Sequence, residues 1–441
     1  MDVLRPGAPG YEDARKPAIA RFHDTRPAAV VRCRTAADVA AAIAFAREAG
    51  LPVAVRSGGH CFAGRSSTTG VVIDVAPMGT VAVTDGKATI GAGARLGAVY
   101  DALAAHGVTI PAGCGPDVGV SGLALGGGLG LLGRMHGLTS DALLGAEVVL
   151  ADGRAVACDA EHDADLFWAL RGAGAGGFGV VIALRFATLP APREATRLHV
   201  VWPAEAAAAV TAAWQEWAPD GPDELAATLL LNEAGATITG AHIGPEREAA
   251  RLLAELVAIA GVEPCSKLLE PGTYHAVKRA LSGMGGVDDA LAVGHAYSRS
   301  EFFARSLPAD AIAALADHVR AGGPARELDL TPMGGAYNRV AEDATAFAHR
   351  GARFVLKHTA VVAADAPESE REAARDRVER AFAIVQPWGT GRVYPNFPEP
   401  GLAGWEHAYH AGNAGRLREV RARYDPDDVF RGPQTIPLAI G

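Results

Sequence analysis

Hydrophobic and polar residues follow helical spacing in some stretches of the chain and form short apolar runs in others. Residues 35–49 have apolar side chains at helical spacing, begin with Thr35, which favours the first position of a helix, and end before Gly50. The apolar run at residues 52–56 then predicts a strand. This succession of helices and strands, with glycines at the turns, predicts an α+β fold for the first part of the chain.

Further elements follow from the same two patterns. Strands are expected at residues 71–75, 81–83, 87–90, 179–186, 228–231, 237–241 and 353–361, and helices at 96–106, 163–171, 204–218 and 245–260. The prolines at positions 190 and 192 mark a boundary, after which the helices become rich in Ala and Glu. We therefore expect a second domain to begin shortly after these prolines.

Length and charge exclude several classes of protein. At 441 residues the chain exceeds the roughly 250 to 300 residues that one core holds, so two domains are expected. The net charge of −9 and the lack of a basic run argue against a nucleic-acid surface. The first ten residues do not resemble a secretory signal, and no stretch reaches the roughly 20 apolar residues of a membrane span. A cytoplasmic protein without nucleic-acid or membrane partners is expected.

The five cysteines do not suggest a disulfide framework. Cys33, Cys61, Cys114, Cys158 and Cys265 are odd in number, widely scattered, and include no C-x-x-C pair for zinc or thioredoxin chemistry. Cys33, Cys158 and Cys265 are interpreted as small buried hydrophobic residues. No metal site is expected.

Three glycine-rich segments carry the candidate chemistry. Residues 56–60 read Arg-Ser-Gly-Gly-His, residues 111–115 read Pro-Ala-Gly-Cys-Gly, and residues 121–130 are dense in glycine. The first two join a nucleophilic side chain, His60 or Cys114, to backbone that only glycine allows to approach a flat, phosphate-bearing ligand. The pattern indicates a cofactor that could be bonded at two points.

A fourth glycine-rich segment, at residues 172–177, resembles a Rossmann dinucleotide site but is not interpreted as one. Residues 172–177 fit G-x-G-x-x-G, the fingerprint of a Rossmann dinucleotide site. That site needs a strand before the glycines and a helix after them. Here the order is reversed, because the helix expected at 163–171 precedes the segment and the strand expected at 179–186 follows it.

These motifs, in this order, resemble the flavoproteins of the vanillyl-alcohol-oxidase superfamily with a p-cresol-methylhydroxylase-type FAD domain, specifically the berberine-bridge-enzyme-like branch. The resemblance runs from residues 30–39 to residues 424–436 and is strongest before about residue 190. It implies FAD as the cofactor, linked covalently through His60 to the flavin 8α-methyl carbon and through Cys114 to flavin C6.

The resemblance also implies a two-domain architecture. Residues 1–194 would form the FAD-binding domain, residues 195–392 a substrate domain with an antiparallel sheet covered by helices, and residues 393–441 a segment completing the first domain. Asp141 is expected to cap local backbone rather than to touch FAD. The other residues implied to bind FAD are Arg56, Ser57, Gly58, Gly59, Gly64, Ser66, Gly113, Gly119, Val120, Gly122, Gly126, Gly127, Gly130, Gly137, Val181, Tyr394 and Asn396.

The chain departs from the family where substrate chemistry is expected. Sugar-oxidising relatives have a Y-x-N-Y element whose last tyrosine removes the substrate proton, but residues 394–397 read Tyr-Pro-Asn-Phe, and Phe397 cannot be a base. Met333 and Leu129 stand at two other positions where relatives have aromatic residues. The strand at residues 353–361 has no carboxylate on either face, although several relatives have one there.

His358 on this strand is then the expected catalytic base, because an imidazole titrates near neutral pH. A satisfied histidine inside the sheet is the alternative explanation, and Tyr394 and Tyr337 are weaker catalytic candidates.

The sequence predicts an FAD-dependent oxidoreductase that moves a hydride from a C–OH or C–NH carbon of a small or natural-product substrate to flavin N5, with O₂ as acceptor. An amine or a hydrophobic alcohol is favoured. A carbohydrate oxidase is one alternative, and a flavin-binding protein without activity is another.

Overall fold

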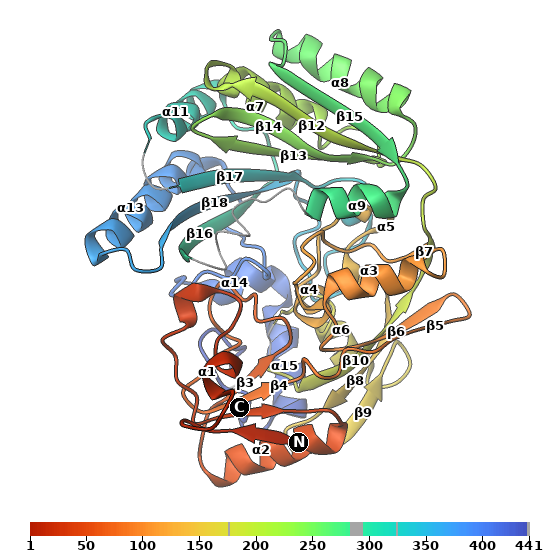
Figure 1. Ribbon diagram of the computed structural model, residues 1–441, viewed down its shortest axis with the longest axis vertical. Helices are drawn as coiled ribbons and strands as arrows, with labels where there is room; N and C mark the ends of the chain where they lie inside the picture. Colours follow the sequence, from red (N-terminus) through yellow and green to blue (C-terminus); the bar gives the residue numbers. More distant parts are fainter. Residues whose placement is uncertain (175–176, 283–293, 323–324, 439–441) are drawn as a thin grey trace.

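The computed structural model describes residues 1–174, 177–282, 294–322 and 325–438. Within these residues the strands form three larger sheets and one two-stranded sheet. In Figure 1 the first part of the chain and its carboxyl-terminal end lie in the lower half of the molecule, and the largest sheet with its helices lies in the upper half.

The two larger sheets of the lower half differ in strand direction. The first has the order β1-β2-β4-β3, with β4 parallel to both β2 and β3, and the second has the antiparallel order β5-β6-β10-β8-β9. The short strands β7 and β11 pair separately. The bounds are β1 Asp2–Leu4, β2 Ala29–Arg32, β3 Val53–Arg56, β4 Val71–Asp74, β5 Val81–Thr84, β6 Lys87–Gly91, β7 Val108–Thr109, β8 Leu143–Val149, β9 Ala155–Cys158, β10 Val180–Ala187 and β11 Leu189–Pro190.

Helix α2 (Ala36–Glu48) forms where the apolar spacing predicts it. The Thr35 hydroxyl accepts a hydrogen bond from the backbone N–H of Asp38 at 3.1 Å, which satisfies one of the free donors at the start of the helix. Beyond its end, Gly50 has a φ of +64°, a conformation that favours glycine. The predicted cap and stop are both confirmed.

The upper half is built on a seven-stranded antiparallel sheet in the order β15-β12-β14-β13-β17-β18-β16. Buried and less buried residues alternate along β13, so its two faces meet different surroundings. The bounds are β12 Ala195–Pro203, β13 Leu225–Asn232, β14 Gly235–His242, β15 Ser266–Gly272, β16 Gly294–Phe303, β17 Ala325–Pro332 and β18 Phe354–Ala363.

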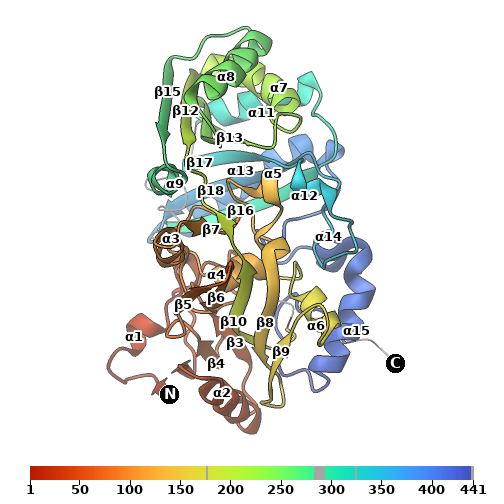
Figure 2. The ribbon, with the colours of Figure 1, turned by 90° about the vertical axis from the view of Figure 1, so that its right-hand side faces the viewer.

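Helices α7, α8, α11 and α13 cover the outer face of this sheet in Figures 1 and 2. The core between these layers contains Trp202 and Trp214, together with Leu356 of β18. The opposite face of the sheet turns towards the lower half of the molecule. The bounds of the covering helices are α7 Ala207–Trp217, α8 Glu246–Ala260, α11 Ala309–Arg320 and α13 Glu368–Val385.

The chain returns to the lower half through α14 and α15 (Figure 1). The Tyr424 hydroxyl at the end of α15 donates to the Asp165 carboxylate of α6 at 2.7 Å.

The sheets and helices together confirm the predicted α+β fold with a helix-covered antiparallel sheet, while the domain limits at 194 and 392 stay a prediction. The remaining helices are α1 Tyr11–Ala14, α3 Leu96–Ala104, α4 Val120–Leu125, α5 Gly133–His136, α6 Ala164–Ala169, α9 Tyr274–Ser282, α12 Ala336–Arg339, α14 Trp405–His410 and α15 Ala414–Tyr424, with short 3₁₀ turns at Ala20–Phe22, Thr139–Ala142, Ala204–Ala206, Gln386–Trp388 and Ala411–Asn413.

The glycine segment at 172–177 follows helix α6 and precedes strand β10, as its flanking sequence predicts. Residues 175 and 176 lie outside the described residues. A helix before the glycines and a strand after them are the reverse of a Rossmann site, so this segment is not a dinucleotide fingerprint.

Candidate active site

Arg56 holds the loop that carries His60. Its buried guanidinium donates to the backbone carbonyls of Ala14 at 2.6 Å, Arg15 at 3.0 Å and Ser66 at 2.9 Å. Burial lowers the pKa of Arg56, and each of its three guanidinium nitrogens donates one of these hydrogen bonds. Arg56 therefore fixes the loop that carries His60, and its contact with FAD stays a prediction.

The loops that carry His60 and Cys114 meet through their backbones. A Cβ at Gly58 would collide with the backbone nitrogen of Gly119, and a Cβ at Gly119 would collide with the Ser57 hydroxyl. The Ser57 hydroxyl itself donates to the Ala92 carbonyl at 2.7 Å. Glycine is therefore required at both positions, and the contact brings the two nucleophile-bearing segments together.

The turn after His60 has a shape and a donor set that suit a phosphate. Gly64 has a φ of +69°, and a Cβ there would lie 2.6 Å from the Phe22 ring. Gly59 also has a positive φ, of +77°. The hydroxyl oxygens of Ser66 and Ser67 are buried and have no hydrogen-bond partner within the described part of the chain. Buried hydroxyls need partners, and the phosphates of FAD would supply them.

Cys114 is half-buried in a cluster that includes Leu131 and Tyr274. Burial raises the pKa of its thiol, and the positive charge of Lys278 opposes that shift. The carbonyl of Gly113, the preceding residue, accepts a hydrogen bond from the Tyr100 hydroxyl at 2.6 Å. Cys114 is thus held in a turn beside a cation, unlike Cys33 and Cys158, which are buried in the hydrophobic core as expected. The expectation that Cys265 is also buried is wrong, because this residue is exposed.

Two tyrosines from separate parts of the chain form hydrogen bonds with the backbone of the glycine-rich segment 121–130. The Tyr394 hydroxyl accepts a hydrogen bond from the Gly128 N–H at 2.9 Å. The Tyr337 hydroxyl accepts from the Gly130 N–H at 3.0 Å and donates to the carbonyl of the same residue at 3.0 Å. Burial raises the pKa of Tyr394 to about 12 and raises that of Tyr337 as well. Both hydroxyls hold the loop.

Asn396 fixes the start of the same segment. Its side-chain amide donates to the Leu123 carbonyl at 2.9 Å and to the Tyr394 hydroxyl at 3.1 Å. A Cβ at Gly126 would collide with this amide, whereas a Cβ at Gly122 would meet nothing within 4 Å. Gly122 therefore faces open space, where a cofactor could approach the backbone closely.

The other candidate residues of the cofactor segments lie in different surroundings. The side chains of Val120 and Val181 are buried in the hydrophobic core of the lower half. Asp141 accepts a hydrogen bond from the Leu138 N–H at 2.9 Å and forms a bidentate ion pair with Arg350 at 2.7 and 2.8 Å. Asp141 therefore caps local backbone, as predicted. Gly127 and Gly137 both have positive φ values, which fit the glycine-dense turn.

The seven-stranded sheet carries an ion pair between two neighbouring strands, Asp329 of β17 and Lys357 of β18. This pair cannot be predicted from the sequence of one strand alone. Strand register places Asp329 of β17 beside Lys357 of β18, and the Lys357 ammonium lies 3.5 Å from the Asp329 carboxylate. The same ammonium lies 4.9 Å from the centre of the Phe397 ring. Phe397 packs edge-on against Tyr394 at 4.9 Å and against Phe62 at 5.8 Å. The pair therefore faces the segment that carries His60.

The sequence pattern that could have indicated this carboxylate lies in β17, the strand next to β18. Residues 327–331 read Glu-Leu-Asp-Leu-Thr, an alternation that places Glu327 and Asp329 on one face. The strand at 353–361 has no carboxylate of its own, as the sequence shows, but Asp329 supplies one across the ladder. Cross-strand neighbours follow from register, which the sequence alone does not give.

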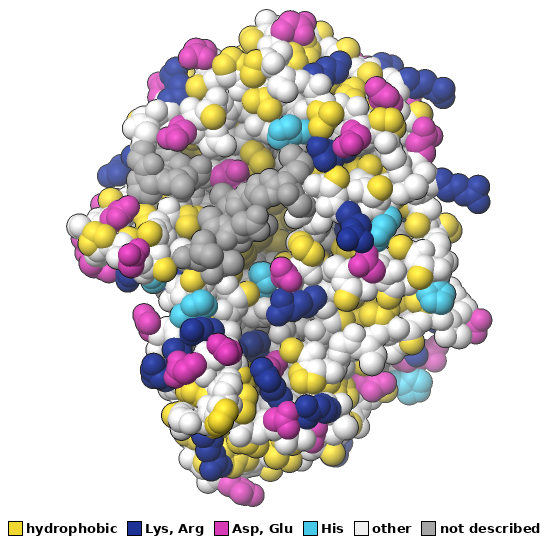
Figure 3. All heavy atoms as spheres, in the orientation of Figure 1, with side chains coloured by type: hydrophobic (Ala, Val, Ile, Leu, Met, Phe, Trp, Pro, Cys, Tyr) yellow, Lys and Arg dark blue, Asp and Glu magenta, His cyan; other side chains and the backbone are white. Residues whose placement is uncertain are grey.

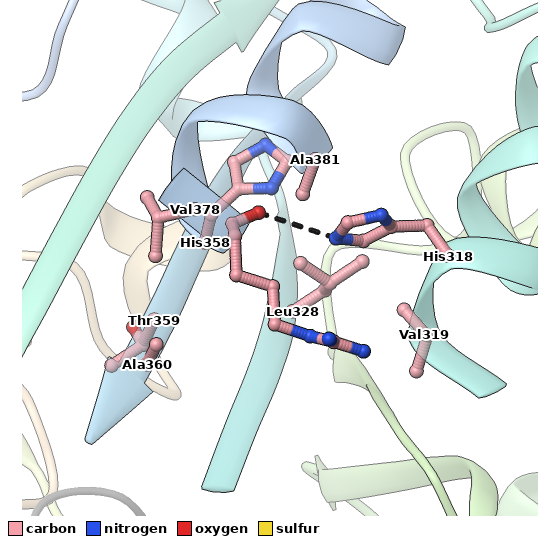
Figure 4. A pocket seen from close by; sticks show the side chains of 9 residues that line it. His318, Val319, Leu328, His358, Thr359, Ala360, Val378 and Ala381 are labelled. Atoms are coloured by element: carbon pink, nitrogen blue, oxygen red, sulfur yellow. Dashed lines mark hydrogen bonds between the residues drawn. The ribbon is translucent and has the colours of Figure 1, made fainter. Parts of the chain in front are cut away.

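The structure corrects the assignment of His358 as the base near the flavin. Its alternation partner Leu356 belongs to the helix-covered core, and the His358 ring packs at 5.9 Å against Phe382 of α13. Figure 4 shows His358 in a small cavity between β18, α11 and α13, facing Ala381, with His318 across the space. Burial, assisted by the positive charges of Arg299 and His318, lowers the pKa of His358 to about 3. The predicted alternation is right, but His358 lies on the helix-covered face of the sheet, opposite to the face that carries Lys357.

Acidic and basic side chains are interspersed on the face drawn in Figure 3. Among the residues that the structure describes, no cluster of three or more His, Cys, Asp or Glu side chains could bind a metal ion. None of the described helices combines the length and the apolar character that crossing a membrane requires.

Comparison with known proteins agrees with this geometry. Residues 27–159 match the FAD binding domain family, and residues 393–437 match the family described as berberine and berberine like. The chain is 34% identical over 444 residues to the FAD-linked oxidoreductase YvdP of Bacillus subtilis, covering 99% of this chain and 97% of that one. It is 31% identical over 436 residues to the chitooligosaccharide oxidase of Gibberella zeae, covering 93% and 87% of the two chains.

A solved structure is similar over the whole length. The glucooligosaccharide oxidase of Acremonium strictum, described with a 6-S-cysteinyl, 8α-N1-histidyl FAD, superimposes with a TM-score of 0.90 at 28% identity, covering 100% of this chain and 98% of that one. Sequence and structure agree on the same group of enzymes. The chain belongs to the berberine-bridge-enzyme-like family of FAD-linked oxidoreductases.

Proposed function

We propose that this protein is an oxidase whose FAD is bonded to both His60 and Cys114 and which oxidises a carbon bearing a hydroxyl group. The contact between Gly58 and Gly119 supports the double linkage, because it joins the two nucleophile-bearing loops. The buried hydroxyls of Ser66 and Ser67 and the open side of Gly122 supply donors and space for the cofactor. FAD, when bound, accepts a hydride from the substrate carbon.

The ion pair of Asp329 and Lys357 is the observation that carries the assignment of proton transfer. A carboxylate within hydrogen-bond reach of a substrate hydroxyl can accept its proton as the hydride leaves. Lys357, 3.5 Å from Asp329, balances the charge that this carboxylate brings into a half-buried site. Phe397, 4.9 Å from the same ammonium, has no hydroxyl with which to take this role. Asp329 is therefore the proposed base.

This carboxylate also changes the expected substrate. The sequence favours an amine because a neutral amine loses a hydride without a base, and the strand at 353–361 lacks a carboxylate. Asp329 provides one from the adjacent strand, so an alcohol no longer lacks a proton acceptor. The chitooligosaccharide and glucooligosaccharide oxidases are named for substrates rich in C–OH carbons, which supports the same class. Dioxygen is the proposed electron acceptor.

Anaerobic reduction of the bound flavin tests the substrate class and the base together. Oligosaccharides, secondary alcohols and amines are each mixed with the oxygen-free protein, and bleaching of flavin absorbance gives the rate of hydride transfer. With an alcohol or sugar, Asp329→Asn should slow bleaching by roughly 10²- to 10⁴-fold, as removal of a general base does. Glu327→Gln is the matched control, because it removes a carboxylate from the same face of the same strand, two residues away.

The outcomes separate the alternatives. If only amines bleach the flavin, and the bleaching rate follows the pKa of the amine itself, alcohols are excluded as the substrate class. A full loss in Glu327→Gln with little effect in Asp329→Asn would assign the base to Glu327 instead. If Asp329→Asn bleaches as fast as wild type with the alcohol, the proton assignment is wrong.

Acid precipitation tests the double linkage. The wild-type precipitate should be yellow, and His60→Ala and Cys114→Ala should each retain flavin through the remaining bond. The double variant should release it. Free FAD in the supernatant of the wild-type protein would refute the linkage.

A further inference from the structure

Lys278 of α9 is a buried lysine whose surroundings differ from those of an ordinary ion pair. Its side chain is almost fully enclosed, with 2% exposure. Its ammonium donates to the Ala112 carbonyl at 2.7 Å and to the Tyr274 hydroxyl at 3.1 Å, and it lies 3.6 Å from the centre of the Tyr100 ring. No carboxylate forms a salt bridge with it in the described part of the chain. Lysine is seldom buried without a charged partner, so this position needs an explanation.

The partners of Lys278 all lead to Cys114. Ala112 lies two residues before Cys114 in the same turn, and Tyr100 donates to the Gly113 carbonyl at 2.6 Å. Cys114 packs in one hydrophobic cluster with Tyr274 and with Val277, the residue next to Lys278. The lysine therefore sits directly behind the turn that presents the thiol.

The electrostatics of the pair are reciprocal. Burial lowers the pKa of Lys278 to about 7, and the thiol of Cys114 opposes that shift. Burial raises the pKa of Cys114, and Lys278 opposes that shift in turn. A proton that moves from the sulfur to the amine creates two opposite charges that stabilise each other.

Few other titratable groups face this pair. Tyr100 on α3 and Tyr274 on α9 line the same space, and burial raises the pKa of both, so they stay neutral. Asp101 lies on the exposed side, where it meets His275 at 3.3 Å and Arg279 at 3.2 Å. The side chains of Asp101 and Arg279 are exposed to solvent, whereas Lys278 is enclosed and Cys114 is half-buried.

We propose that Lys278 is the positioning residue that makes Cys114 reactive towards FAD. Its amine takes up the thiol proton, and the resulting ammonium holds the thiolate in its turn. This inference rests on the proposed double linkage. Sulfur then bonds to flavin C6, the hydrogen on that carbon leaves as a proton, and the two electrons of its bond remain in the flavin ring. Dioxygen takes these two electrons with two protons and becomes H₂O₂, and Lys278 returns its proton to solvent.

The test follows formation of the bond to Cys114 in the full-length protein. Lys278→Met removes the amine, and Lys278→Gln keeps a neutral donor for the Ala112 carbonyl if the methionine variant folds poorly. Arg279→Met is the matched control, because it removes an exposed cation from the next position of the same helix. Each protein is purified at pH 7.5, digested, and analysed by mass spectrometry for flavin on the peptides that contain Cys114 and His60. Samples are then incubated in air between pH 7.5 and 9.5.

The wild type and Arg279→Met should have flavin on both peptides at pH 7.5. In the lysine variants the flavin should remain on His60, and the bond to Cys114 should form about 10²-fold more slowly. Its rate should rise about tenfold per pH unit, because bulk hydroxide then removes the thiol proton. A merely structural role of Lys278 would not give this rescue by pH.

Two results would overturn the inference and leave the double linkage intact. One is a Lys278→Gln protein that links Cys114 at the wild-type rate at pH 7.5. The other is a folded variant that carries flavin on His60 but forms no bond to Cys114 at any pH. A wild-type protein without flavin on Cys114 would instead refute the proposed linkage itself, and Lys278 would then have no such role.

Discussion

Replacing His358 with leucine should stabilise the protein against acid. The folded state keeps this histidine neutral because burial lowers its pKa to about 3, whereas the unfolded chain binds a proton near the ordinary value of about 6.5. The unfolded state therefore binds more protons between these two values, so stability is complete above about pH 6.5 and is lost as the pH falls. At 1.36 kcal/mol per pKa unit, lowering the pH from 6.5 to 5.0 costs about 2 kcal/mol through this one side chain.

The structure indicates that leucine is tolerated at position 358. Both ring nitrogens of His358 are buried and lack hydrogen-bond partners among the described residues, and Val378, Ala381 and Phe382 surround the ring. An unsatisfied buried polar group costs about 1 to 3 kcal/mol, so the variant should equal or exceed the wild type at pH 7.5. Its advantage should then grow by about 2 kcal/mol at pH 5.0.

Urea unfolding at pH 7.5, 6.5, 5.5 and 5.0 measures this difference. Tryptophan fluorescence is the suitable signal, because Trp202 and Trp214 lie in the same helix-covered core. His106→Gln, at an exposed position, is the control and should leave the pH dependence unchanged. The reasoning fails if His358→Leu and wild type lose stability in parallel, or if the variant no longer reduces its flavin with substrate.

Three further substitutions, with Gly122→Ala as a control for the last, test the framework of the site. Asp141→Asn leaves the buried guanidinium of Arg350 without its carboxylate and should cost about 3 to 5 kcal/mol in the free energy of unfolding by urea. Arg56→Met removes three bonds to backbone carbonyls and should lower the molar ratio of flavin to protein, measured by absorbance after purification. Gly126→Ala should displace the Asn396 amide, so flavin content and melting temperature should both fall, whereas Gly122→Ala should keep the melting temperature.

The cofactor loops could be predicted because their chemistry is local in the sequence. The segment at 56–60 contains both the nucleophile and the glycines that its turn requires, and the structure gives each glycine a reason in a close contact or a positive φ. Their meeting with residues 114–119 follows from the order of motifs in the family. The role of Arg56 could not be read in this way, because its partners at Ala14 and Arg15 lie about forty residues earlier.

The sheet face that carries Asp329 and Lys357 could not be predicted to the same extent. Alternation correctly separates His358 from Lys357, but a period of two does not say which face meets the helices. Leu356 and Phe354 indicate the answer only once α7 and α13 are placed against that face. Asp329 enters the site through strand pairing, at a sequence distance that no local pattern spans. Lys278 is likewise defined by its contact with the turn before Cys114.

Tyr394 remains the other catalytic candidate from the sequence, and its geometry favours a structural role. Its hydroxyl oxygen accepts hydrogen bonds from the Gly128 N–H and from the Asn396 amide, so its lone pairs already serve the glycine loop. Burial raises its pKa to about 12, so forming the phenolate at pH 7 would cost about 7 kcal/mol before it could accept a proton. That cost alone exceeds the roughly 3 to 6 kcal/mol that the 10² to 10⁴ of general-base catalysis represents. The structure therefore favours Asp329, which lies 3.5 Å from the Lys357 ammonium, as the proposed proton acceptor.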